Sequence, residues 1–144
     1  PDINCAIGIS QLERLDEIVD KRDRIARKYN EQLKDIAGIQ LPNIKKNIKM
    51  SWFVYVIKLE NNFTQNDRDK VLQKLRSDGI NCSNYFPPIH LQELYKENFG
   101  YKEGDFEITE KVSARTIALP FYNNLKDQHI NYITNSLRQI MEEF

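Results

Sequence analysis

The 144-residue sequence predicts one α+β domain in which helices cover a small sheet of two or three strands. Apolar residues recur at helical spacing through several long segments. Only two or three short runs are rich in the β-branched and aromatic residues that are typical of strands. With so few strands among the helices, the sheet is expected to be mixed or antiparallel. Apolar residues make up 40% of the chain, enough for one modest core.

A long helical segment is expected over residues 3–36. The apolar residues that recur there at spacings of three and four are Cys5, Ile9, Leu12, Leu15, Val19, Ile25, Tyr29, Leu33 and Ile36. Asp2 is suited to cap this helix, because its carboxylate can accept hydrogen bonds from the free amides of the first turn. Gly38 and Pro42 end the segment. A kink is expected in the charged stretch at residues 20–23, whose side chains are expected to face solvent.

Residues 50–59 predict the first strand. Every residue from Trp52 to Ile57 is β-branched or aromatic, which is typical of strands. The run is apolar on both of its faces. We therefore expect this strand to lie in the centre of the sheet, with both faces covered.

A helix is expected over residues 65–78. Thr64 is in the N-cap position and Asp67 in the capping-box position, so each can bond the backbone amide of the other. Gly79 ends the helix. The stripe that should face the core consists of Val71, Leu72 and Leu75.

A second strand is expected over residues 80–86. Pro87 and Pro88 end it, because proline has no amide hydrogen to offer a neighbouring strand. The chain then becomes helical over residues 90–98, and Gly100 ends that helix.

The last third of the sequence predicts two more helices around a short extended piece. Asp105 is suited to cap a helix over residues 106–117, and residues 118–121 are expected to be extended. One side of that helix carries Ile108, Val112 and Thr116. The final helix is expected over residues 126–144. Its apolar stripe is the cleanest in the chain and consists of Ile130, Ile133, Leu137, Ile140, Met141 and Phe144.

Composition excludes several classes of function. Basic and acidic residues number 21 each, which argues against a dedicated nucleic-acid binder. No apolar run approaches the roughly 20 residues that cross a membrane. Cys5 and Cys82 lie among apolar neighbours and are expected to be free buried thiols, which favours a reducing, cytoplasmic location. His90 and His129 are too far apart for a histidine-based zinc site, and His129 is expected at the surface.

The segment at residues 84–90 is the strongest candidate for a binding site. It joins two aromatic side chains, Tyr85 and Phe86, to His90 through two prolines that stiffen the turn. A rigid turn of this kind can form a wall against a ring-shaped ligand. The alternative is structural: the aromatic side chains belong to the core and His90 caps the next helix.

Five stretches of the sequence, in order, resemble the DegT-type aminotransferases, which make amino sugars on nucleotide-linked substrates. The most specific runs from residue 84 to 92, Asn-Tyr-Phe-Pro-Pro-Ile-His-Leu-Gln, and is most similar to the perosamine-synthase-like branch. The other four are Asp2 to Gly8 with Gln11 and Leu12, Ser51-Trp52 with Tyr55-Val56, Gly100-Tyr101 with Gly104 to Phe106, and Ala118 to Tyr122. Together they span essentially the whole chain.

The resemblance implies that residues 1–144 are the C-terminal small domain of a pyridoxal phosphate (PLP) aminotransferase of fold type I, with residues 1–36 as the long interdomain helix segment. It implies that the PLP-binding domain and its lysine lie outside this chain, so no catalytic or cofactor-binding residue is assigned here. The intact enzyme would use PLP to transfer an amino group from glutamate to a keto group on a nucleotide sugar, and would be a homodimer. The chain alone would be inactive.

Within that enzyme, Tyr85, Phe86 and His90 would form one wall of the substrate pocket. His90 would hydrogen-bond a sugar hydroxyl or the glutamate carboxylate. The alternative function is a free-standing α+β module for interaction or metabolite binding. The two differ over residues 3–19: an aminotransferase domain should expose their apolar side chains, whereas a free-standing module should pack them.

Overall fold

The computed structural model describes residues 1–144 and confirms an α+β fold. In chain order the elements are α1 (Asp2–Leu12), α2 (Leu15–Leu33), β1 (Ile39–Gln40), β2 (Tyr55–Leu59), α3 (Gln65–Ser77), the 3₁₀ turn η1 (Ile89–Leu91), α4 (Glu93–Phe99), α5 (Glu107–Ser113), β3 (Thr116–Leu119) and α6 (Asp127–Met141). None of these helices combines the length and apolarity that a membrane crossing requires.

The three strands form an antiparallel sheet in the order β1-β2-β3. Strand β2 is central, as predicted, with Tyr55 opposite Leu119 and Ile57 opposite Ile117. Side chains along β2 alternate between fully and partly buried, which corrects the expectation that both faces are covered. Helix α6 packs on both α2 and α3, and the core contains the residues of β2 that are fully buried.

The core consists of 23 buried apolar residues, which come from these three helices, the sheet and the segments that connect them. The predicted stripe of α6 is confirmed from Ile130 to Met141, all buried. Phe144 is the exception: it lies beyond the helix, half exposed, with its ring edge against Phe63. The capping box of α3 is also confirmed, because Thr64 and Asp67 bond each other's backbone amides. Arg68 joins the predicted stripe as a buried residue.

The predicted single helix over residues 3–36 is two helices, and the break lies at Glu13 and Arg14. The charged stretch at residues 20–23 is an unbroken part of α2, so the predicted kink is wrong. Residues 21–23 are also only partly exposed, and Arg22 donates to the Trp52 carbonyl at 2.9 Å and to Asn123, which corrects the expectation that this stretch faces solvent. Asp2 is the first helical residue and makes no capping hydrogen bond, so its predicted role is also wrong.

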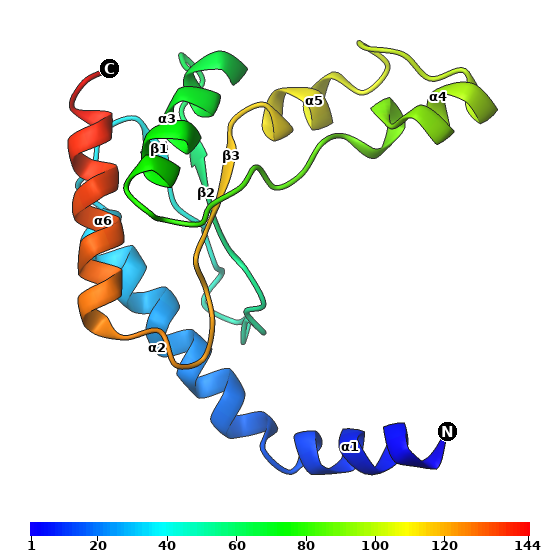
Figure 1. Ribbon diagram of the computed structural model, residues 1–144, viewed down its shortest axis with the longest axis vertical. Helices are drawn as coiled ribbons and strands as arrows, with labels where there is room; N and C mark the ends of the chain where they lie inside the picture. Colours follow the sequence, from blue (N-terminus) through cyan, green and yellow to red (C-terminus); the bar gives the residue numbers. More distant parts are fainter.

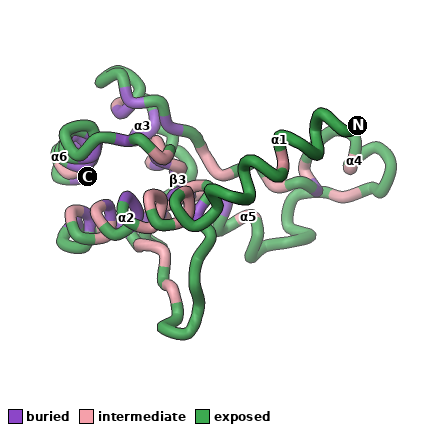
Figure 2. The backbone as a smooth tube through the Cα atoms, turned by 90° about the horizontal axis from the view of Figure 1, so that it is seen from below, coloured by how far each residue is buried: buried purple, intermediate pink, exposed green.

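Helix α1 buries none of its residues. Its apolar side chains are exposed, as are Cys5, which was expected to be buried, and Leu15 at the start of α2. Cys82 is buried as a free thiol. In two perpendicular views α1 and the segment of α4 and α5 extend to the same side of the packed body (Figures 1 and 2).

The predicted strand over residues 80–86 is reduced to one isolated bridge between Ser83 and Ala118. The backbone beyond Ser83 bonds side chains instead of a strand, because both polar backbone groups of Tyr85 pair with the Thr116 hydroxyl. The predicted helix over residues 106–117 ends at Ser113, and the chain becomes β3 three residues later. Thr116 therefore belongs to β3 and not to the predicted side of the helix, whereas Ile108 and Val112 line one groove together and are exposed.

Candidate functional site

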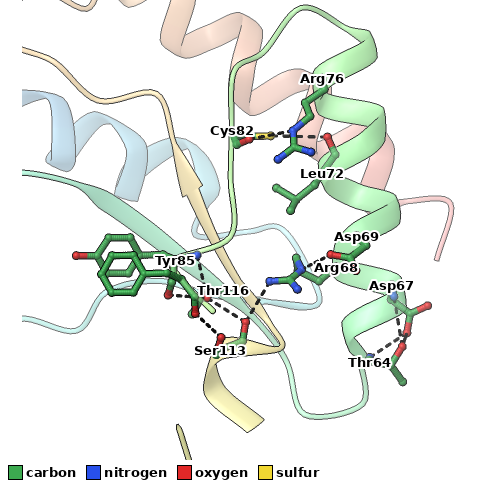
Figure 3. A network of polar contacts seen from close by, with 11 residues as sticks. Thr64, Asp67, Arg68, Asp69, Leu72, Arg76, Cys82, Tyr85, Ser113 and Thr116 are labelled. Carbon is green, nitrogen blue, oxygen red and sulfur yellow. Dashed lines mark hydrogen bonds and ion pairs between the residues drawn. The ribbon is translucent and has the colours of Figure 1, made fainter. Parts of the chain in front are cut away.

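The candidate site lies on an arm, residues 84–115, that leaves the packed body between the Ser83 bridge and β3 (Figure 1). A polar network fixes the base of this arm (Figure 3). Arg68, from α3, donates to the Ser113 carbonyl at 3.1 Å, and the Ser113 hydroxyl donates to the Phe86 carbonyl. The Thr116 hydroxyl donates to the Tyr85 carbonyl at 3.0 Å. The sheet and α3 thus hold the two aromatic residues by their backbone, which leaves their side chains free.

The rings of Tyr85 and Phe86 lie together, with centroids 4.5 Å apart. Tyr85 is partly buried, and Phe86 is 56% exposed although it is a large apolar side chain. An open groove of about 360 Å³ runs beside them; it is lined by Tyr85, Phe86, Pro87, Pro88, Ile89, Ile108, Thr109, Val112 and Ser113. The structure therefore presents these two predicted residues as an apolar surface that a ligand can reach.

His90 lies in a different environment from the two aromatic residues before it. Its side chain is 7% exposed. The ring packs on Phe106, with centroids 4.7 Å apart, and meets Tyr101 edge to face. His90 is also inside the 3₁₀ turn rather than at the cap of the next helix. The arm therefore brings Tyr85 and Phe86 together and holds His90 in a second aromatic cluster.

Glu110, from α5, is the polar partner of His90. Its Oε1 lies 2.8 Å from Nε2 of the imidazole. The same carboxylate accepts from the backbone amides of Gly104, at 3.0 and 3.1 Å, and Phe106, at 3.2 Å. The Gly104 amide and then the other partners hold the pKa of this carboxyl below its usual range. Sequence analysis missed Glu110, because nothing in the spacing of a single acid 20 residues from a histidine signals a contact.

A PLP site makes specific demands on its lysine. That cofactor is held through a lysine in a pocket that also binds its phosphate and ring nitrogen. No lysine in this structure is buried; Lys58 and Lys74 are only partly covered, and Lys70 is exposed. An open pocket of about 570 Å³ lies between α3 and the C-terminus and contains none of the three predicted site residues. No group of side chains is arranged to bind a metal ion.

Comparison with known proteins identifies the family of the chain. Residues 1–138 match the DegT/DnrJ/EryC1/StrS aminotransferase family. Over 142 residues the chain is 34% identical to the uncharacterized protein MJ1066 of Methanocaldococcus jannaschii and 29% identical to the spore coat polysaccharide biosynthesis protein SpsC of Bacillus subtilis. These alignments cover 99% and 98% of the chain but only 37% and 36% of the relatives.

A solved structure has the same arrangement. PseC of Helicobacter pylori, an aminotransferase involved in the biosynthesis of pseudoaminic acid, superposes with a TM-score of 0.86 at 25% identity. The match covers 96% of this chain and 37% of PseC. The chain therefore spans little more than a third of the length of the proteins that it matches.

Proposed function

Because the chain belongs to the DegT/DnrJ/EryC1/StrS aminotransferase family, we propose that it is the C-terminal small domain of a longer PLP-dependent sugar aminotransferase. The amino donor is glutamate, and the acceptor is a keto group on a nucleotide-linked sugar. The names of two relatives, one acting in polysaccharide biosynthesis and one in pseudoaminic acid biosynthesis, support a sugar as the substrate class.

The exposed apolar face of α1 carries the proposal that a further part of the protein covers this chain. Ile3, Ile7 and Leu12 are each more than half exposed, and no residue of α1 is buried. Large apolar side chains that are exposed on more than one side of a helix are typical of an interface. A free-standing module, the alternative function, would be expected to pack these residues. The partner proposed for this face is the PLP-binding part of the protein together with a second subunit of a homodimer.

Tyr85 and Phe86 are proposed as the substrate wall. Their backbone carbonyls accept from the hydroxyls of Ser113 and Thr116, and their rings lie against each other with a tilt of 31°, so the wall is largely formed before a ligand arrives. An aromatic face of this kind can pack against a sugar or base ring, and a preordered wall lowers the entropy lost on binding.

His90 is proposed to contact the substrate through its second ring nitrogen. Nε2 is engaged by Glu110, whereas Nδ1 has no hydrogen-bond partner in the chain and is not among the fully buried unpaired atoms. The unprotonated Nδ1 can accept a hydrogen bond from a sugar hydroxyl. If the imidazole gains a second proton, Nδ1 can instead donate to the carboxylate of the substrate glutamate.

The direct test is to incubate the full-length protein with PLP, glutamate and a panel of nucleotide keto sugars. We expect mass spectrometry to show one amino sugar nucleotide product, with 2-oxoglutarate formed in equal amount. His129→Ala is a matched control for His90→Ala, because His129 is exposed and lies on α6, outside the arm. Transfer to simple keto acids, with no nucleotide sugar accepted, would contradict the proposal.

A further inference from the structure

The arm that carries the candidate site has almost no core of its own. Between residues 84 and 115 the only buried residues are His90 and Ser113, and neither is apolar. Ser113 belongs to the network at the base of the arm. Farther out, the shape of the arm depends on the aromatic cluster around His90 and on the hydrogen bonds of Glu110.

Glu110 joins three segments of the arm through one carboxylate. It reaches His90 in the 3₁₀ turn η1, and the Gly104 and Phe106 amides in the loop that leads into its own helix. That loop also presents Phe106, whose ring packs on the imidazole. Removal of the carboxylate would leave the two amides and His90 without their acceptor. The imidazole would then lose its charged partner, and the loop that packs Phe106 on it would lose its hydrogen bonds.

The carboxylate also decides which imidazole nitrogen is available. An ionised carboxylate only accepts hydrogen bonds, so the nitrogen that faces it at 2.8 Å must carry the proton. That nitrogen is Nε2, and a neutral imidazole then keeps an unprotonated Nδ1. The lowered pKa of Glu110 keeps this carboxylate ionised near neutral pH.

We propose that Glu110 is a positioning residue that fixes the Nε2-protonated tautomer of His90, so that Nδ1 is presented to the substrate as a hydrogen-bond acceptor. The inference rests on the proposed function for the role of Nδ1. The tautomer itself depends only on the geometry of the arm.

The tautomer can be measured without any activity assay. The protein is labelled with ¹⁵N-histidine, and the ring nitrogens of His90 are assigned by comparison with the variant His90→Gln. At about pH 8, where an ordinary imidazole is neutral, we expect Nε2 to carry the proton in the wild-type protein. In Glu110→Gln we expect a mixture of tautomers, because an amide can either accept from or donate to Nε2. A proton on Nδ1 in the wild-type protein overturns the proposal, even if the variant does not fold.

Kinetics test whether Glu110 acts through His90. In the full-length enzyme Glu110→Gln is expected to lower kcat/KM for the sugar substrate about tenfold, and the double variant with His90→Ala should be no slower than His90→Ala alone. Additive losses would contradict the proposal. Glu107→Gln is the matched control, since Glu107 is on the same helix but forms an exposed pair with Lys111.

The two proposals fail separately. Suppose that Nε2 of His90 is protonated in the wild-type protein and that this tautomer is lost in Glu110→Gln, but that His90→Ala leaves activity unchanged. The substrate role of His90 is then wrong, and the positioning role of Glu110 stands. If His90→Ala impairs turnover while Glu110→Gln keeps the wild-type tautomer and rate, the positioning role is wrong and the proposed function stands.

Discussion

The rings of Tyr29 and Tyr55 stack with centroids 4.7 Å apart and join α2 to the central strand β2. Both side chains are fully buried, and both hydroxyls are hydrogen-bonded: Tyr29 donates to the Pro120 carbonyl at 2.8 Å and Tyr55 to Asn30 at 2.6 Å. The pair therefore ties the helix that follows α1 to the sheet from which the arm extends.

Removing one of these hydroxyls should cost stability without changing the fold. Tyr29→Phe leaves the Pro120 carbonyl without its donor, so we expect the free energy of unfolding to fall by about 1 kcal/mol. Tyr29→Ala should cost about 3–5 kcal/mol, because it also empties the space of a buried ring. Urea denaturation measures both, and Tyr122→Phe is the control, because Tyr122 is exposed and its hydroxyl makes no hydrogen bond within the chain. If Tyr29→Phe and Tyr29→Ala lowered the free energy of unfolding equally, the packing role of the Tyr29 ring would be contradicted.

The same pair predicts how stability depends on alkaline pH. Burial raises the pKa of Tyr29 and of Tyr55 well above the usual range. In the unfolded chain both hydroxyls ionise near about pH 10. Their contribution is therefore fully present below that pH and is lost as pH rises above it. We expect the melting temperature to decline above about pH 10 more steeply in the wild type than in Tyr29→Phe; parallel curves would show that this tyrosine does not contribute.

Local chemistry is what the sequence predicted best. The Thr64 and Asp67 pair needs only three residues of helix to form, and the stripe of α6 needs only a helical repeat, so both could be derived without knowing the fold. The aromatic, proline and histidine residues at 84–90 indicated the candidate site, and the family resemblance at residues 84–92 favoured a binding role over a structural one.

What the sequence could not predict depends on contacts between distant segments. Residues 80–86 have strand composition, but Tyr85 pairs with the side chain of Thr116, 31 residues away, and not with a strand. The contact between His90 and Glu110 is likewise set by the fold of the arm. The break at Glu13 has no sequence signal such as glycine or proline, and the structure offers no contact of α1 that explains it. The cytoplasmic location, the homodimer and the perosamine-synthase-like branch stay predictions.

The chain produced alone is expected to self-associate through α1. Covering one exposed leucine-sized side chain stabilises a dimer by about 1.5–3 kcal/mol. Association costs at least about 4 kcal/mol in lost translational and rotational entropy, so two or three such side chains offset much of that cost. Because no residue of α1 is buried, its apolar side chains are available for such contacts. Ile7→Asp should shift micromolar protein to monomer in sedimentation, unlike Ile48→Asp, a control on an exposed loop. A wild-type monomer at high concentration would contradict this.

The chain produced alone should also fail to bind PLP at a specific lysine. No lysine is buried in a pocket that could hold the cofactor's phosphate and ring nitrogen. After incubation with PLP and reduction with borohydride, mass spectrometry should show only low, scattered labelling of exposed lysines. Stoichiometric labelling of a single lysine would show that the chain carries a cofactor site of its own.

His90→Ala should impair the full-length enzyme more than its stability alone explains. The lost hydrogen bond to a charged or transition-state group corresponds to about 1.5–3 kcal/mol, or about ten- to a hundredfold in turnover. The structure adds a stability cost that the sequence did not indicate. The substitution removes a ring that packs against Phe106, and it leaves the Glu110 carboxylate with one donor fewer. Assays well below the melting temperature separate the two effects. Unchanged kinetics together with a large fall in melting temperature would support the structural reading of this histidine.

Phe86→Ala offers the cleanest separation of binding from stability. The ring is 56% exposed, and its backbone carbonyl would still accept from Ser113 after truncation. We therefore expect the free energy of unfolding to change by no more than about 0.5 kcal/mol. If the ring packs on the substrate, its loss should weaken binding by about 0.5–1.5 kcal/mol and raise the KM for the sugar nucleotide by about two- to tenfold, with the KM for glutamate unchanged. Phe99→Ala is the control, because Phe99 is similarly exposed but lies on α4, outside the groove. An unchanged sugar KM would remove Phe86 from the proposed wall.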